Sequence, residues 1–159
     1  PIVEPEVLMD GPHDIDACEA VTETTLKTVY HELHQQGVVL EGTLLKPNMV
    51  ISGTECPQQA SIEEVAQRTM TCLKRSVPAA VPGIVFLSGG QSDQAATRHL
   101  NSMNATASNL PWKLSFSYGR ALQAAPLKAW GGENFDQGKA AFLQRAKANG
   151  EACVGKYKE

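Results

Sequence analysis

The sequence predicts an α/β fold built on a parallel sheet. Its 159 residues are 42% apolar and 19% charged, a composition typical of a globular domain with a sizeable core. Short apolar or β-branched runs alternate four times with stretches of helical period. The expected strands start at Ile2, Val38, Ile84 and Leu114. Each connection therefore has room for the crossover helix that joins parallel strands.

The first unit begins with Ile2 and Val3 as a strand and continues into a helix whose N-cap we expect to be Asp14. One face of this helix carries apolar residues at positions i, i+3, i+4 and i+7, namely Leu26, Val29, Tyr30 and Leu33. Gly37 is the expected C-terminal stop, because glycine readily adopts the left-handed conformation that ends a helix.

The second unit begins with the apolar run 38–45, which we interpret as a buried strand that ends at Lys46. Pro47 cannot continue a sheet ladder, so a loop follows. Ser61 and Glu64 form a capping box, in which each side chain satisfies a backbone N–H of the first helical turn. A helix is therefore expected to begin there.

The third and fourth units complete the sheet and add a helical tail. The remaining expected elements are, in order, a strand at 84–87, a helix at 92–103, a strand at 114–117, and helices at 121–130 and 134–149. Two architectures fit four parallel strands. A doubly wound sheet usually has a glycine-rich turn after its first strand, which is absent here. Half of a (β/α)8 barrel also fits, although a whole barrel has about 250 residues.

Charge and composition exclude several classes of function. With 14 basic and 17 acidic residues, the net charge of −3 offers no general attraction to nucleic acid or to an anionic membrane. The aromatic residues are too scattered to form a stacking surface for bases, and no apolar stretch approaches the roughly 20 residues that span a bilayer. We therefore expect no nucleic-acid or membrane partner.

The cysteines and histidines show no metal-binding pattern. The four cysteines, Cys18, Cys56, Cys72 and Cys153, lack the close spacing of a zinc or redox motif, so we expect reduced, buried thiols. His31 and His34 share a helix face, but no third ligand has a matching spacing. No metal site is expected.

Lys46 is the strongest candidate for chemistry. An ammonium at the end of a buried strand is desolvated, which disfavours its charged form. A neutral lysine amine attacks carbonyl groups and forms a Schiff base with a ketone or aldehyde. A strand-end lysine more commonly extends into solvent. The residues around Lys46 are therefore needed to distinguish a reactive amine from a solvated one.

Two acidic residues are expected to lie on one face of the first strand. Side chains alternate across a strand, so Glu4 and Glu6 point the same way, with Pro5 between them. Crowded carboxylates can leave one of them able to hold a proton near neutral pH. The plainer alternative is a pair that is solvated or salt-bridged at the end of a strand.

Two loops that follow strands could hold a phosphate. Ser88, Gly89 and Gly90 come directly after a strand and before a helix, where backbone N–H groups and the positive helix end favour an anion. Ser117, Gly119 and Arg120 follow the next strand, and a guanidinium matches phosphate geometry. Either loop alone could be an ordinary glycine turn. Together with the acids and the lysine they indicate a phosphorylated carbonyl substrate.

The segments IVEPE, LEGTLLKPNMV, VFLSGGQS, FSYGRALQ and KAWGG, in this order and spacing, closely resemble class I fructose-bisphosphate aldolases. The resemblance covers residues 1–159 and implies the second half of a (β/α)8 TIM barrel, with strands five to eight present. It implies that Lys46 is the Schiff-base lysine, that Glu4 is the acid/base group, and that Glu6 orders the charges around them. By the same resemblance the C1-phosphate of the substrate is held by Ser88, Gly89, Gly90, Ser117, Gly119 and Arg120.

The resemblance also implies a reaction. It is the reversible cleavage of fructose 1,6-bisphosphate to dihydroxyacetone phosphate and glyceraldehyde 3-phosphate, in glycolysis and gluconeogenesis, with no metal or other cofactor. Members are usually homotetramers. The string GTLLKPNMV favours a cytoplasmic protein over a plastid one. The first half of the barrel and the C-terminal arm are not in this chain, so we expect the isolated fragment to be inactive. The alternatives are a non-catalytic scaffold or binding remnant of an aldolase, and a transaldolase-like lysine-imine enzyme.

Overall fold

The computed structural model describes residues 1–158, in which four parallel strands form one sheet in the order β1-β2-β3-β4. The elements are β1 (Ile2–Val3), α1 (Ile15–Gln35), the 3-10 helix η1 (Leu40–Gly42), β2 (Leu44–Leu45), α2 (Ile62–Ser76), β3 (Gly83–Phe86), α3 (Asp93–Thr106), β4 (Lys113–Phe116), α4 (Arg120–Trp130) and α5 (Phe135–Ala152). The predicted α/β class, the parallel pairing and the order of the elements are confirmed.

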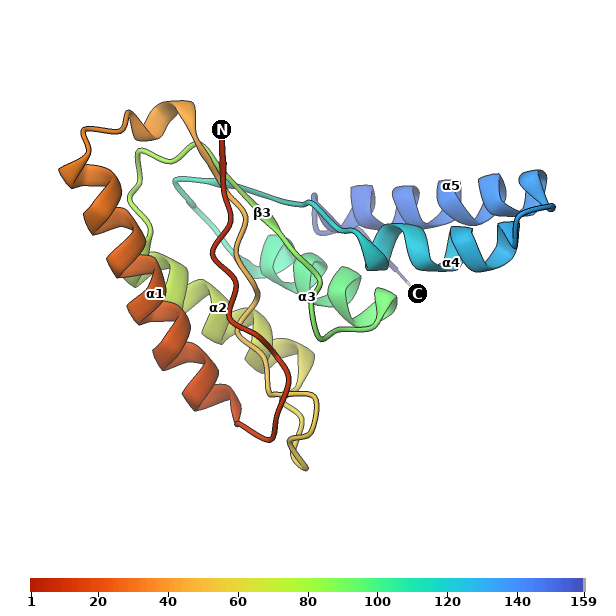
Figure 1. The fold of residues 1–159 in the computed structure, drawn as a ribbon, viewed down its shortest axis with the longest axis horizontal. Helices are drawn as coiled ribbons and strands as arrows, with labels where there is room; N and C mark the ends of the chain where they lie inside the picture. Colours follow the sequence, from red (N-terminus) through yellow and green to blue (C-terminus); the bar gives the residue numbers. More distant parts are fainter. Residues whose placement is uncertain (159) are drawn as a thin grey trace.

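The helices are unevenly distributed around the sheet. In Figure 1 the strands run in front of α2 and α3, and α1 packs beside α2. The last two helices, α4 and α5, pack on each other as a hairpin that extends away from the sheet beyond α3. Among the described residues no helix covers the face of the sheet that is turned toward the viewer in Figure 1.

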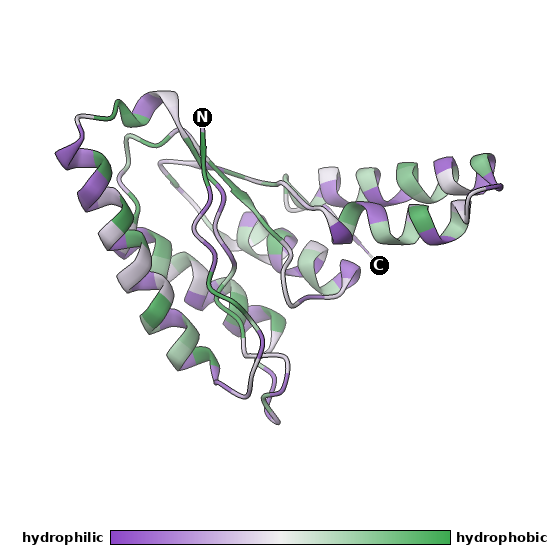
Figure 2. Ribbon diagram, viewed as in Figure 1, coloured by the Kyte–Doolittle hydropathy of each residue, from purple (hydrophilic) through white to green (hydrophobic). Residues whose placement is uncertain are grey.

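The burial of the strands follows this arrangement. Leu45, Ile84 and Phe86 are fully buried against the helices. On the opposite face Ile2 is 54% exposed, and Val85 is only half-buried. Figure 2 shows hydrophobic residues along the central strands and on recurring turns of the helices. The core therefore lies between the sheet and one helical layer.

The caps that begin the helices follow the sequence. Asp14 accepts a hydrogen bond from the backbone N–H of Ala17, at 2.9 Å, and Ser61 accepts one from that of Glu64, at 3.1 Å. Ser92 caps α3 in the same way. Because each cap satisfies a donor that has no partner within the helix, these residues fix where α1, α2 and α3 begin.

The prediction of one buried strand over 38–45 is wrong. Only Leu44–Leu45 forms β2, and the residues before it turn through η1. The turn is held by the Thr43 side chain, whose Oγ1 donates to the Leu40 carbonyl at 2.8 Å. Val39 is 70% exposed. An apolar run was mistaken for a strand because a local hydrogen bond from Thr43 competes with the sheet ladder there.

No helix within residues 1–158 combines the length and the apolar character needed to cross a membrane.

Replacing the cap of α2 tests how that helix is held. Ser61→Ala removes the acceptor for the Glu64 N–H, and in the full-length protein we expect it to lower the free energy of unfolding by about 1 kcal/mol. Urea denaturation measures the loss. Ser61→Asn keeps an acceptor and should change stability by only a few tenths of a kcal/mol. Equal losses in both variants would contradict the assignment of the cap.

Candidate active site

Lys46 and Glu4 lie together at the carboxyl ends of two neighbouring strands. The Lys46 Nζ atom is 2.7 Å from Glu4 Oε1. The lysine side chain is 20% exposed and the glutamate side chain 49% exposed. The amine is therefore largely withdrawn from water and faces a carboxylate, rather than extending into solvent.

The backbone sets this pairing. β1 and β2 run parallel with Val3 opposite Leu45, and the Lys46 N–H continues the ladder by donating to the Val3 carbonyl at 2.7 Å. On the other side the Pro47 carbonyl accepts from the Leu87 N–H at 3.1 Å. Lys46 is thus held between the first and third strands, beside Glu4.

Asn48 fixes the segment that carries both acids, and it was not among the predicted site residues. Its Oδ1 accepts from the Val7 N–H at 3.0 Å, and its Nδ2 donates to Thr22 Oγ1 at 3.0 Å. Asn48 is 3% exposed. A lone amide inside the otherwise apolar run after Pro47 was the available signal, because a buried polar side chain must find partners.

The Lys46–Glu4 ion pair is expected to add little to the stability of the fold. An ion pair with a half-exposed carboxylate stabilises a fold by about 0–1 kcal/mol. At 2.7 Å, however, the carboxylate and the lysine nitrogen are close enough to exchange a proton directly. The arrangement can therefore add an amine to a carbonyl and move protons on the same face of the sheet.

Glu6 lies toward the third strand. Its side chain is close to Gly89, since a methyl group built on that glycine would be 2.9 Å from Glu6 Oε1. The structure thus brings Glu6 to the first predicted phosphate loop, two positions along the chain from Glu4. Gly89 leaves the space that this carboxylate occupies.

The first predicted phosphate loop is shaped by its neighbours. Ser88 is buried and lies two residues after the end of β3. Gly90 has φ +73°, and a methyl group there would be 2.5 Å from the Met9 Cβ atom. Glycine is therefore required at position 90 both for its backbone conformation and for space.

The second predicted loop leaves the neighbouring strand at the same end. The Ser117 N–H donates to the Phe86 carbonyl at 2.9 Å, which places Ser117 beside the end of β3. Gly119 and Arg120 are exposed, and Arg120 is the first residue of α4. The two loops therefore lie next to each other.

Tyr118 ties the second loop to the helix that follows the first. Its phenol donates to the Ala96 carbonyl of α3 at 2.9 Å, and Tyr118 is 4% exposed. Burial, with a smaller contribution from Cys153, raises the pKa of this phenol. No sequence pattern singled out Tyr118, because its partner belongs to a different element of the fold.

His99 supports the first loop from behind. It is 6% exposed in α3, and its Nδ1 lies 2.7 Å from Gln91 Oε1, so the ring nitrogen is the donor. Burial, with a smaller contribution from Arg98 and an opposing one from Glu63, lowers the pKa of His99 to about 4. The sequence had suggested no role for His99.

The thiols and histidines form no metal centre. Within the part of the chain that the structure describes, no three His, Cys, Asp or Glu side chains could hold an ion together. All four cysteines are free, but only Cys18 and Cys72 are buried as expected, while Cys56 and Cys153 are half-buried. Burial raises the pKa of the Cys72 thiol to about 12, so it is unreactive near neutral pH.

A hollow of about 640 Å³ lies elsewhere, beside the start of α1. It is lined by Pro12, His13, Asp14, Ile15, Asp16, Ala17, Ser52, Cys56, Pro57, Gln58, Gln59, Ala60 and Glu64. None of the predicted site residues borders it. The candidate chemistry lies instead on the uncovered face of the sheet and at its carboxyl edge.

Known proteins match this chain along its whole length. The sequence model of the family described as fructose-bisphosphate aldolase class-I matches residues 1–159. A probable fructose-bisphosphate aldolase class 1 of Xanthomonas axonopodis pv. citri is 58% identical over 161 residues, which are 99% of this chain and 48% of that protein. A relative from Arabidopsis thaliana, named fructose-bisphosphate aldolase 6, cytosolic, is 58% identical over 99% of this chain and 44% of its own length.

The fold agrees with these sequences. The fructose-bisphosphate aldolase of Plasmodium falciparum, solved in a ternary complex with TRAP and a small-molecule inhibitor, matches with a TM-score of 0.96 and 52% identity. The match covers 100% of this chain and 46% of that chain. This chain thus spans about half the length of the curated relatives and of the solved structure that it matches.

Gly90→Ala tests the shape of the first phosphate loop. Alanine at Gly90 would adopt a left-handed backbone and also collide with Met9, whereas at Gly37, with φ +66°, nothing lies within 4 Å. In the full-length protein we expect Gly37→Ala to cost about 1 kcal/mol and Gly90→Ala about 1–3 kcal/mol more. Denaturant unfolding gives both values. Equal losses would show that the contact with Met9 is unimportant.

The buried histidine predicts a pH dependence of stability. The unfolded chain binds a proton at His99 near its ordinary pKa of 6.5, whereas the folded chain binds it only near 4. Stability is therefore fully present above pH 6.5 and is lost as the pH falls toward 4, by about 2 kcal/mol at pH 5.

Unfolding free energies of the full-length protein at pH 7 and pH 5 measure this effect. His99→Asn keeps a donor for Gln91 but does not titrate. The unfolding free energy of this variant should therefore fall by about 2 kcal/mol less than that of the wild type between pH 7 and pH 5. The exposed control His31→Asn should behave like the wild type. A wild type and a His99→Asn variant with the same pH dependence would contradict the prediction.

Proposed function

Because the chain belongs to the class I fructose-bisphosphate aldolase family, we propose that the protein containing it cleaves fructose 1,6-bisphosphate reversibly through a Schiff base on Lys46. The products are dihydroxyacetone phosphate and glyceraldehyde 3-phosphate. The observation that carries the proposal is the 2.7 Å contact between Lys46 Nζ and Glu4 Oε1 at the carboxyl edge of a parallel sheet. Membership of this family removes the transaldolase-like alternative.

The chain is, in this proposal, the second half of a (β/α)8 barrel, with β1 to β4 as strands five to eight. Two observations support it. The chain covers 44% to 48% of the relatives compared above, and one face of its sheet carries exposed apolar residues such as Ile2. The remaining strands would cover that face. An isolated chain would be inactive, because the rest of the pocket would come from the other half and from a C-terminal arm.

Imine formation is the first step of the proposed mechanism. The Lys46 amine gives up its proton to the Glu4 carboxylate and adds to the C2 carbonyl of the substrate, forming a carbinolamine. Glu4 then returns a proton to the departing hydroxyl, and water leaves. The product is a protonated imine between C2 and Nζ, beside a carboxylate that balances its charge.

Cleavage of the C3–C4 bond follows. The electron pair of that bond moves toward C2 and onto the imine nitrogen, while the C4 hydroxyl loses its proton to Glu4 and C4 becomes the aldehyde of glyceraldehyde 3-phosphate. The enamine on Lys46 takes a proton at C3, and water hydrolyses the imine to release dihydroxyacetone phosphate. In this mechanism Glu6 orders the charges around Lys46 and Glu4.

The C1-phosphate is assigned to the two loops at the carboxyl edge. Ser88, Gly89 and Gly90 offer a hydroxyl and backbone N–H groups, and Ser117, Gly119 and Arg120 offer a hydroxyl, a backbone N–H and a guanidinium. α3 and α4 both begin at this edge, and the positive ends of their dipoles favour an anion. The phosphate would hold C2 within reach of Lys46.

We expect no metal or organic cofactor, because the protonated imine accepts the electrons that a metal-bound carbonyl would otherwise accept. A homotetramer and a cytoplasmic location, with the plastid as the alternative, belong to the same proposal. The cytosolic name of the Arabidopsis relative supports the location. A scaffold that lacks activity would be indicated if the full-length protein released no triose phosphate.

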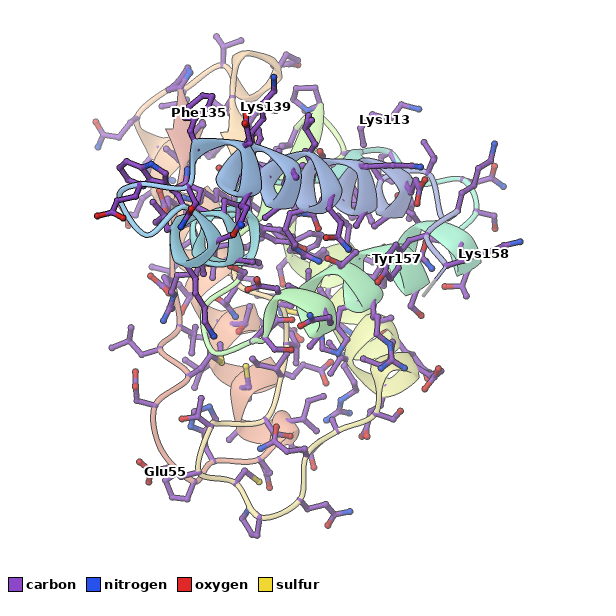
Figure 3. All side chains as sticks on the ribbon, turned by 90° about the vertical axis from the view of Figure 1, so that its right-hand side faces the viewer. Glu55, Lys113, Phe135, Lys139, Tyr157 and Lys158 are labelled. Carbon is purple, nitrogen blue, oxygen red and sulfur yellow. The ribbon has the colours of Figure 1, made fainter. Side chains whose placement is uncertain are left out.

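Steady-state kinetics of the full-length protein test the function. Wild type should release dihydroxyacetone phosphate from fructose 1,6-bisphosphate, and Lys46→Met should abolish turnover. Glu4→Gln should lower kcat by about 100- to 10,000-fold, the usual range for loss of a general acid/base. Lys113→Met is the matched control, since the exposed Lys113, labelled in Figure 3, is the first residue of β4, whereas Lys46 follows the last residue of β2. Turnover in Lys46→Met equal to that of Lys113→Met would overturn the proposal.

A further inference from the structure

Arg145 is a buried cation whose hydrogen-bond acceptors are all neutral. It lies in α5 and is 8% exposed. Its Nε donates to the Ala121 carbonyl at 2.9 Å, and its Nη2 donates to the Asp93 carbonyl and to Thr97 Oγ1, both at 2.7 Å. The Asn149 side-chain oxygen lies 3.5 Å from the same Nη2. Since burial of a guanidinium is costly without an anionic partner, its retention calls for an explanation.

The acceptors place Arg145 behind the two loops assigned to phosphate. Asp93 is the first residue of α3, directly after the loop that contains Ser88, Gly89 and Gly90. Ala121 is in the first turn of α4, directly after Gly119 and Arg120. One guanidinium therefore joins the starts of the two helices, and Figure 3 shows α5 lying beside α4 with α3 next to them.

A second contact joins the same two segments. Tyr118, which lies inside the second loop, donates to the Ala96 carbonyl in the first turn of α3. Thr97 adds a link to α5, because its Oγ1 also donates to Asn149 at 2.6 Å. The starts of α3 and α4 are thus fastened to each other and to α5 by buried polar side chains.

The electrostatics are unfavourable unless an anion is present. Helix N-termini carry partial positive charge, and a cation near two of them is repelled. A phosphate between the loops would offset this repulsion. The planar fork of arginine can hold two carbonyls at a fixed separation, which a lysine ammonium on a flexible stem cannot.

We propose that Arg145 is a positioning residue that sets the separation of the two phosphate-binding loops. It touches no reacting atom; it acts through the backbone at Asp93 and Ala121. The inference rests on the proposed function, because it assigns a role within the phosphate site of that reaction. Its consequence is selectivity for a phosphorylated ketone over the same ketone without phosphate.

Imine trapping in the full-length protein tests this role. Borohydride reduction is carried out at increasing concentrations of dihydroxyacetone phosphate or of dihydroxyacetone, in wild type, Arg145→Gln and Arg145→Lys. Both variants should raise the half-saturating concentration of dihydroxyacetone phosphate by about tenfold, equivalent to about 1.4 kcal/mol. Trapping of dihydroxyacetone should be unchanged. Lys147→Met, which removes an exposed cation from the same helix, should match the wild type for both ketones.

Several outcomes would overturn the inference. One is an unchanged half-saturating concentration of dihydroxyacetone phosphate in a folded Arg145 variant. Another is an equal rise in the half-saturating concentrations of both ketones, which a purely structural role of Arg145 would produce. If neither variant folds, Thr97→Val, which removes one acceptor of Arg145, should raise the half-saturating concentration of dihydroxyacetone phosphate by a smaller factor. An unchanged value there would also overturn the inference.

Failure of the proposed function is distinguishable from these results. It would appear as a wild type that traps neither ketone. Equilibrium binding of inorganic phosphate to wild type, Arg145→Gln and Arg145→Lys then tests the role of Arg145 independently of any imine. Weaker binding in both Arg145 variants would support its role, and equal binding in all three would overturn it.

Discussion

Parallel pairing of the four strands is the constraint on which the candidate site depends. Because β1 to β4 run in one direction, the residues that follow them meet at one edge of the sheet. Glu4 follows β1, Lys46 follows β2, Ser88 follows β3 and Ser117 follows β4. An acid, an amine and the two loops proposed to bind phosphate are thus collected from four separate segments of the sequence. The neighbouring register of β1 and β2 brings the first two groups to 2.7 Å.

Local features of the sequence predicted much of this arrangement. Asp14 and Ser61 cap their helices as predicted, because capping needs only residues three positions apart, and the alternation of apolar runs indicated the parallel pairing. The run 38–45 was misread, because apolar composition does not reveal the hydrogen bond from Thr43 that turns the chain. Strand alternation and the end of an apolar run singled out Glu4, Glu6 and Lys46, but the specific role predicted for each came only from strings that resemble the aldolases.

The supporting residues could not be predicted for a different physical reason. Asn48 pairs with Val7, and Arg145 with Asp93, across different elements of the fold, so their partners are set by tertiary packing. Each is a buried polar side chain whose hydrogen bonds reach the backbone of a segment next to a proposed site residue. The sequence shows that such residues are present, but the fold alone shows which loop each one holds.

In the proposed reaction the amine of Lys46 becomes covalently bonded to a substrate carbon, a bond that mass-spectrometric peptide mapping detects. The full-length protein is incubated with fructose 1,6-bisphosphate, reduced with borohydride and digested. We expect a reduced three-carbon or six-carbon phosphate adduct on the peptide that contains Lys46, and on no other lysine of this chain. An adduct located on a different lysine, or an active protein that carries no adduct, would contradict it.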